Sequence, residues 1–224
     1  MKQTLALIHT VAGLASTFQV LCQEILPDTD VFHMVDESLL KNTIRAGHLT
    51  PATARRVVGQ VASAEAAGAD AVLVTCTSIG SAVEMARSLV SVPVIRVDEA
   101  MAEQAVRAGV RVGVAATLRT TLDPTTDLLR RHAVRVEGEP RVVIPHLCAG
   151  AFEALGAGDT ARHDALIAQG LRELMEQVDV IVLAQASMAR VAQSLPPDEQ
   201  RVPVLSSPRS GVERAGEVLR QSLD

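Results

Sequence analysis

The chain has 224 residues, of which 48% are apolar, and its formal net charge at pH 7 is −5. Only three residues are aromatic, all of them Phe, which excludes a tyrosine acid and the aromatic stacking platform of single-stranded nucleic-acid binders. No block of Lys and Arg is present, so we expect no nucleic-acid partner. Apolar residues run along the whole length, which excludes a disordered chain and suffices for one large domain or two small ones.

The N-terminal segment and the cysteines indicate a cytoplasmic protein. The first apolar run is broken by His9 and Thr10, so it predicts a buried strand rather than a signal peptide. No apolar stretch reaches the roughly 20 residues of a membrane span, and we expect no membrane contact. Cys22, Cys76 and Cys148 are odd in number and form no CxxC pair, which argues against a disulfide framework and a zinc site.

Short β-branched runs alternate with longer Ala-rich segments from the N-terminus onward. Several runs are almost continuously apolar, which is typical of parallel strands covered on both faces. The predicted strands are residues 4–10, 31–37, 69–75, 92–97, 111–117, 134–138, 179–184 and 202–206. The predicted helices are residues 12–26, 51–67, 81–89, 99–108, 121–132, 159–177, 189–195 and 209–222, with Asp159 or Thr160 as the cap of the sixth. This alternation predicts an α/β fold built from parallel sheets flanked by helices.

The chain also repeats itself. An offset of 109 residues takes Gln60 to Gln169 and Asp70 to Asp179 without a gap, and helix, strand and turn agree in order across both segments. We therefore predict two pseudo-symmetric α/β lobes, with the last helix returning to the first. The predicted lobes are residues 1–97 plus 207–224 and residues 98–206.

The repeat indicates where a site would lie. In open parallel sheets, ligands bind beyond the carboxyl ends of the strands, and two such lobes facing each other would form one cleft. We therefore expect the active site in a cleft between the lobes, built from the segments "HT", "TCTS", "ATLRTT" and "AQAS", which are residues 9–10, 75–78, 116–121 and 184–187. None of the three Phe lies in these segments, which favours a short aliphatic acid over an aryl substrate.

Cys76 is the main candidate in the first lobe. It follows an apolar strand and precedes a helix, whose N-terminus favours the thiolate. Thr77 and Ser78 add hydroxyl groups, and with the N–H groups of the turn they form a possible cradle for a carboxylate or enolate. The alternative is a small buried residue, as most free cysteines are.

Three threonines, Thr117, Thr120 and Thr121, follow the first strand of the second lobe. At a helix N-terminus such side chains either bind an anion or only cap the helix. Two acids, Asp36 and Glu37, end the second predicted strand, where they would recognise an amino or hydroxyl group or simply be solvated.

Five segments carry a family resemblance. In order, "LVTCTSIGS", "VPVIRVDEAM", "VGVAATLRTTLDP", "GAFEALGAGDTARHD" and "VLAQASM" resemble the aspartate/glutamate/hydantoin racemase superfamily over essentially the whole chain. The resemblance implies two α/β lobes, no cofactor, a small carboxylate substrate and a homo-oligomer. The racemases of this superfamily use two cysteines, one on each face of the substrate's α-carbon. Arylmalonate decarboxylase and maleate isomerase belong to the same superfamily.

The resemblance also implies roles for individual residues. Cys76 matches the cysteine of the first lobe, and Thr77 and Ser78 match the loop that holds a substrate carboxylate. Thr117 and Thr120 match the "ATxxT" carboxylate site. The second cysteine is replaced by Gln185 in "LAQASM", and the offset of 109 from Cys76 leads to the same position. The other expected substrate contacts at the strand ends are Thr10, Thr121, Ala186 and Ser187.

The missing cysteine leaves three hypotheses open, because a Gln amide neither accepts nor supplies a proton near neutral pH. His9 would serve the second face as acid/base, with His146 and Cys148 as further candidates. Alternatively, a single thiol would support a decarboxylase or a cis–trans isomerase, or the chain would bind a small acid without turnover. Our leading hypothesis is a racemase- or epimerase-type isomerase of a small aliphatic acid with Cys76 as acid/base.

Overall fold

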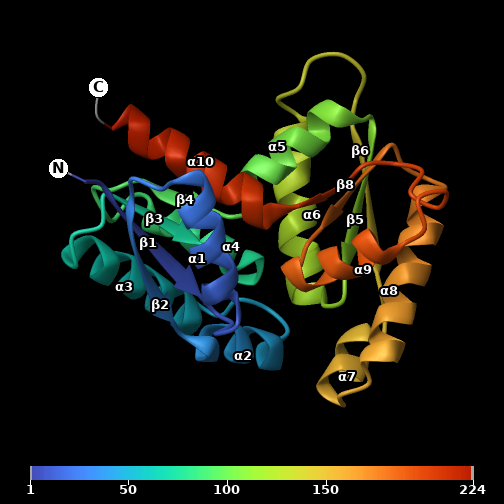
Figure 1. Ribbon diagram of the computed structural model, residues 1–224, viewed down its shortest axis with the longest axis horizontal. Helices are drawn as coiled ribbons and strands as arrows, with labels where there is room; N and C mark the ends of the chain where they lie inside the picture. Colours follow the sequence, from blue (N-terminus) through green and yellow to red (C-terminus); the bar gives the residue numbers. More distant parts are fainter. Residues whose placement is uncertain (1, 223–224) are drawn as a thin grey trace. The chain divides into compact units, whose positions relative to one another are not determined.

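The computed structural model describes residues 2–222 and forms two compact units (Figure 1). One unit contains the chain up to Glu99 together with the segment from Pro208 onward, and the other is Ala100–Ser207. Each unit contains one four-stranded parallel sheet, as predicted from the alternating pattern. The sequence-based bounds, 1–97 plus 207–224 and 98–206, stay a prediction of domain organisation.

The first unit has a sheet in the order β2-β1-β3-β4. Its strands are β1 (Thr4–His9), β2 (Asp30–Val35), β3 (Ala71–Val74) and β4 (Val94–Arg96). Its helices are α1 (Leu14–Ile25), α2 (Glu37–Ala46), α3 (Pro51–Ala66), the short 3₁₀ helix η1 (Thr77–Ile79), α4 (Gly80–Ala86) and α10 (Ser207–Gln221).

Both faces of this sheet are covered, because successive side chains of a strand point to opposite sides. Leu5 and Leu7 of β1 pack in one apolar cluster with side chains of α1 and α10. Ala6 and Ile8 pack in a second cluster with side chains of α3 and α4. The continuous apolar sequence of β1 follows from this double burial.

The second unit repeats this topology, with its sheet in the order β6-β5-β7-β8. Its strands are β5 (Arg111–Ala116), β6 (Val142–Leu147), β7 (Val180–Leu183) and β8 (Val204–Ser206). Its helices are α5 (Glu99–Ala108), α6 (Arg119–Ala133), α7 (Ala151–Gly156), α8 (Thr160–Met175), the 3₁₀ helix η2 (Ala186–Met188) and α9 (Ala189–Ser194). Side chains of α5 and α6 cover one face of the sheet, and those of α8 and α9 cover the other.

The internal repeat extends to individual hydrogen bonds. Asp70 Oδ2 accepts the Thr4 N–H at 2.7 Å in the first unit, and Asp179 Oδ2 accepts the Arg111 N–H at 2.7 Å in the second. Each carboxylate therefore holds the start of the first strand of its own sheet. The predicted repeat is confirmed. The last helix, α10, packs in the core of the first unit.

One predicted strand is wrong. Residues 134–138 follow the end of α6 as an exposed turn, in which Val134 is 84% exposed, and the strand is β6 instead. Pro145 made residues 142–147 a poor strand candidate because it lacks an N–H group. Since β6 lies at the edge of its sheet, that missing donor is tolerated. The sequence-based prediction also missed α2 and α7.

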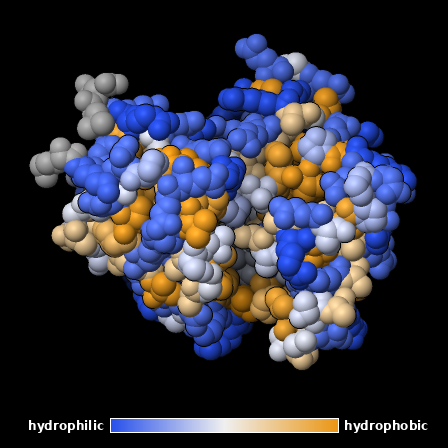
Figure 2. Space-filling model, viewed as in Figure 1, coloured by the Kyte–Doolittle hydropathy of each residue, from blue (hydrophilic) through white to orange (hydrophobic). Residues whose placement is uncertain are grey.

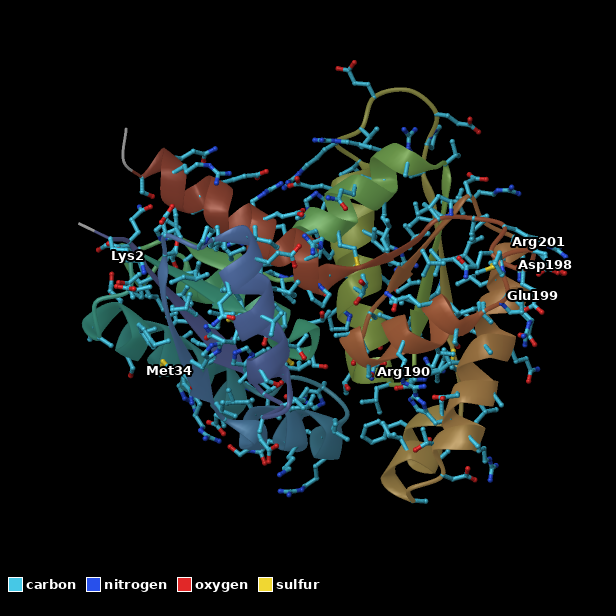
Figure 3. All side chains as sticks on the ribbon, in the orientation of Figure 1. Lys2, Met34, Arg190, Asp198, Glu199 and Arg201 are labelled. Carbon is cyan, nitrogen blue, oxygen red and sulfur yellow. The ribbon has the colours of Figure 1, made fainter. Side chains whose placement is uncertain are left out.

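On the face seen in Figure 2, apolar residues form small groups among hydrophilic ones. Figure 3 labels Arg190 of α9 and Glu199, both of which form ion pairs with α8. Arg190 Nη2 lies 2.7 Å from Asp164 Oδ1, and Glu199 Oε2 lies 2.6 Å from Arg172 Nε. Such exposed pairs contribute little to stability. Within residues 2–222, no helix has the length and apolar character that a membrane crossing requires.

Candidate functional site

Cys76 lies directly beyond the carboxyl end of β3. It occupies the position before η1, and its partly buried side chain packs against the apolar cluster of α3 and α4. Its sulfur hydrogen-bonds the hydroxyl of Thr10, which follows the neighbouring strand β1. The backbone N–H groups of Ser78 and Ile79 also donate to it. The structure therefore brings together Thr10, Cys76 and Ser78, as the strand-end prediction expected.

The pKa of the Cys76 thiol is raised above its ordinary value. Burial is the largest cause, because it disfavours the charged thiolate. The Thr10 hydroxyl and the two backbone N–H groups act in the opposite direction, and the Asp98 carboxylate raises the pKa further. The expected stabilisation of the thiolate by the helix N-terminus stays a prediction, because burial acts against it.

A buried ion pair lies beside this loop. Arg96 of β4 donates to Asp98 through Nε at 3.0 Å and through Nη2 at 2.8 Å, and the two side chains are 2% and 1% exposed. Arg96 also pairs with Glu84 of α4. A Cβ at Gly80 would lie 2.5 Å from Arg96 Cζ, so only glycine lets the guanidinium pack on the start of α4. The turn that provides N–H groups to Cys76 is therefore followed by Gly80, which packs directly against the buried guanidinium of Arg96.

His9 lies at the end of β1, fully buried, and both of its ring nitrogens have partners. Nδ1 lies 2.8 Å from Thr75 Oγ1, and Nε2 lies 2.8 Å from Nδ1 of His33 on β2. His33 Nε2 lies 2.8 Å from Gln19 Oε1 on α1. With neutral rings, His33 donates to the Gln19 oxygen and His9 donates to His33. The Thr75 hydroxyl has a single proton and two acceptors within reach, His9 Nδ1 at 2.8 Å and the Ile8 carbonyl oxygen at 3.1 Å.

Burial and the neighbouring His33 lower the pKa of His9 to about 4, and burial lowers that of His33. Both rings are therefore neutral near pH 7. The role of His9 as the second acid/base stays a prediction. Its observed contact is the hydrogen bond to Thr75, the residue before Cys76.

Gln185 occupies in the second unit the position that Cys76 has in the first. It lies beyond the carboxyl end of β7, directly before η2. Its Oε1 accepts two hydrogen bonds from Thr117 at the end of β5, from the backbone N–H at 2.6 Å and from the hydroxyl at 3.0 Å. The pair of Thr117 with Gln185 matches the pair of Thr10 with Cys76, so the repeat is preserved although the thiol is lost.

The start of α6 lies next to this pair in the chain. Within residues 2–222, the backbone N–H groups of Arg119 and Thr120 have no acceptor, because they open the helix and no side chain caps it. The Thr120 hydroxyl oxygen is buried and has no hydrogen-bond partner in the described part of the chain. Pure capping, the alternative reading of these threonines, therefore does not account for Thr120.

The other predicted contacts lie in the same segments. Thr77 and Ser78 are buried in η1, and Thr121 is buried in the first turn of α6. Ala186 and Ser187 belong to η2, where Ser187 is exposed. Their contact with a substrate stays a prediction.

His146 and Cys148, the further candidates for a second acid, pack against α8. A Cβ at Gly170 of that helix would lie 2.7 Å from both His146 Nε2 and Cys148 Sγ. Burial and the nearby Glu173 raise the pKa of Cys148 to about 11. Both residues therefore pack between the sheet of the second unit and α8.

The two acids after β2 form the start of a helix. Asp36 caps α2, because its Oδ1 accepts the Ser38 N–H at 3.0 Å, and Glu37 is the first helical residue. Asp36 Oδ2 also lies 2.6 Å from Arg56 Nη2 and 2.9 Å from Gln60 Nε2. These contacts explain Asp36 without a substrate. No group of three or more His, Cys, Asp or Glu that would hold a metal ion occurs among residues 2–222.

Sequence reasoning missed His33, Gln19 and the pair of Arg96 with Asp98. A signal existed for the pair, since "VIRVDEA" places an Arg and an Asp two residues apart in an otherwise apolar strand end. His33 offered none, because its contact with His9 depends on the parallel register of β1 and β2, in which Leu7 lies opposite His33.

A four-stranded parallel sheet repeated in two units, with hydrogen-bonding side chains at matching strand ends, defines the class of two-lobe α/β proteins that includes the racemases. The chain belongs to the Asp/Glu/hydantoin racemase family, whose model, described as Asp/Glu/Hydantoin racemase, matches residues 9–215.

Solved structures share the fold at low sequence identity. A glutamate racemase isoform from Bacillus anthracis is 18% identical with a TM-score of 0.75, covering 99% of this chain and 84% of its own. An allantoin racemase from Klebsiella pneumoniae is 19% identical with a TM-score of 0.67, covering 98% and 89%. An aspartate racemase homologue from Pyrococcus horikoshii OT3 is 14% identical with a TM-score of 0.70, covering 98% and 100%. No curated protein sequence matches the chain.

Proposed function

We propose that this protein is a cofactor-independent isomerase, of racemase or epimerase type, that moves a proton at the α-carbon of a small aliphatic carboxylic or amino acid. Cys76 is its acid/base. The observation that carries the proposal is the position of this cysteine at the end of β3, where the Thr10 hydroxyl and two backbone N–H groups donate to its sulfur. Membership of a family described by racemases supports the reaction class.

The chemistry follows from the donors at the strand ends. Removing an α-proton places negative charge on the substrate's carboxylate oxygens, and preorganised N–H and O–H donors stabilise that charge. Thr77 and Ser78 beside Cys76, and Thr120 at the start of α6, are the side chains proposed to bind carboxylate groups. The family resemblance supplies the expectation that the enzyme is a homo-oligomer.

A second candidate is a lyase in which a single thiol protonates a carbanion formed by decarboxylation. Gln185 favours it, because an amide with its oxygen held by Thr117 supplies no proton to the second face of a carbanion. A cis–trans isomerase with one cysteine shares this argument.

Proton NMR in deuterated water separates these candidates. The protein is incubated with both enantiomers of small amino and hydroxy acids and with alkylmalonates. An isomerase exchanges the α-hydrogen of an unaltered carbon skeleton and produces the second enantiomer. A decarboxylase releases carbon dioxide and leaves one deuterated product enantiomer. Absence of exchange and of decarboxylation across the panel would reject the proposed function and support a small-acid binding protein.

A further inference from the structure

The amide of Gln185 has only one possible orientation. Its partner at 2.6 Å is the backbone N–H of Thr117, which can donate and cannot accept. The atom facing it must therefore be the amide oxygen, and the Thr117 hydroxyl donates to the same oxygen at 3.0 Å. Because the amide is planar, Nε2 lies on the opposite branch, away from Thr117.

This orientation leaves the amide nitrogen available. Within residues 2–222, no group accepts a hydrogen bond from Gln185 Nε2, and the side chain is only partly buried. The chain therefore presents two N–H bonds at the end of β7 without a partner. Nε2 is accessible to solvent, so a ligand that accepts from it need only displace water.

Other donors without partners lie in the adjoining segment. The buried Thr120 hydroxyl and the first amides of α6 have no partner within the described residues. The exposed Arg119 side chain opens the same helix and forms no ion pair in that part of the chain. Positive charge and unpaired N–H groups at a helix N-terminus favour an anion.

We propose that Gln185 is a substrate-binding residue whose Nε2 donates to a carboxylate oxygen, and that this strand end selects an oxygen-rich anionic group over an ammonium group. The inference rests on the proposed function for the identity of the ligand as a substrate. In this chain the N–H and the hydroxyl of Thr117 both donate to Gln185. We therefore assign to Gln185 the hydrogen-bond donation to a carboxylate that the resemblance implies for Thr117. The residue that replaces the second thiol thus sets specificity rather than moving a proton.

Calorimetric titration with malonate, and with 1,3-diaminopropane as a cationic probe of similar length, tests this proposal on the full chain. The wild type should bind malonate and not the diamine. In Gln185→Glu one carboxylate oxygen still accepts from Thr117, while the other replaces the donor with an anionic acceptor. Malonate affinity should then fall by roughly 10- to 100-fold, the range of a hydrogen bond to a charged group.

The matched control is Gln104→Glu, which adds the same charge to the same unit at an exposed position of α5. It should bind malonate as the wild type does. Gln185→Met removes the donors without adding charge and should lose roughly 10-fold in affinity, so the test survives if the Glu variant fails to fold. The proposal is overturned if the wild type binds neither probe, if it binds both equally, or if the folded Gln185 variants retain wild-type affinity for malonate.

This binding measurement requires no turnover. If malonate binding depends on Gln185 while no acid exchanges its α-proton, the proposed function fails and the role of Gln185 stands. If exchange occurs and Gln185→Glu turns over with an unchanged KM, the role of Gln185 fails and the proposed function stands.

Discussion

At Cys76, some neighbouring groups raise the pKa of the thiol and others lower it. Three donors stabilise the thiolate, whereas burial and the carboxylate of Asp98 disfavour it, and the net direction is upward. A thiol with a raised pKa is a poor nucleophile at rest and becomes a strong base once its proton has left. A thiol with a raised pKa is therefore better suited to proton transfer at a carbon atom than to nucleophilic attack, which requires a thiolate at neutral pH.

Alkylation tests the state of this thiol. Iodoacetamide should label Cys76 more slowly near pH 7 than it labels a free cysteine, because less of the thiol is ionised. The rate should keep rising as the pH passes the ordinary cysteine value of 9.0. Peptide mass spectrometry over a pH series measures it. A rate that levels off below pH 8 would instead indicate an activated thiolate.

At the scale of elements, the ends of β1, β2 and β3 are joined by the chain of Thr75, His9 and His33. The pKa of His9 is about 4 in the folded protein and 6.5 as its reference value. In the unfolded chain His9 therefore binds a proton below about pH 6.5, whereas in the folded chain it becomes protonated only near pH 4. This contribution to stability is complete above pH 6.5 and is lost as the pH falls toward 4.

Urea unfolding at pH 7 and pH 5 measures this contribution. The free energy of unfolding should fall by about 2 kcal/mol more in the wild type than in His9→Gln over this interval. His48→Gln, at an exposed position, is the control and should follow the wild type. Equal pH dependence in all three proteins would mean that the pair of histidines does not couple folding to pH.

The same scale shows what the sequence could and could not predict. Residues 111–117 and 179–184 read as strands because burial on both faces demands continuous apolar sequence. The sequence predicts Asp159 or Thr160 as the cap of α8, and Asp159 is the cap, because its side chain accepts the Arg162 N–H at 3.0 Å. The strand with Pro145 was missed, since its tolerance depends on an edge position that only the assembled sheet defines.

The candidate site was predictable in position and not in contacts. The repeat located Gln185 at the position of the missing thiol, yet the orientation of its amide depends on Thr117, which lies 68 residues away in the chain. The partnerless Thr120 hydroxyl likewise follows from packing around α6 rather than from residue type.

At the scale of the whole molecule, the two units have the same topology, and each contains one helix that follows the last strand of the other unit. The helix that follows β4, α5, packs in the second unit, and the helix that follows β8, α10, packs in the first. Outside this exchange, β3 and β7, η1 and η2, and α3 and α8 correspond element by element. The proposed loss of one acid/base is therefore a change of one side chain within a framework that both units share.

Restoring that side chain is a direct test of the framework. Gln185→Cys should raise the rate of racemisation of an accepted substrate by about 10²-fold or more, the usual contribution of a positioned acid/base. Thr117 would then face a thiol, as Thr10 faces Cys76. Polarimetry of each enantiomer measures the gain, and an unchanged or lower rate would show that the second strand end does not serve the α-carbon.

The central claim, that Cys76 transfers the proton at the α-carbon, is tested most directly by deuterium incorporation into an accepted acid in deuterated water. The rate is compared among the wild type, Cys76→Ser and Cys22→Ser, the last of which changes a buried cysteine of α1. We expect Cys22→Ser to retain its rate and Cys76→Ser to lose roughly 10²–10⁴-fold while remaining folded. Incorporation at the wild-type rate in folded Cys76→Ser would contradict the account.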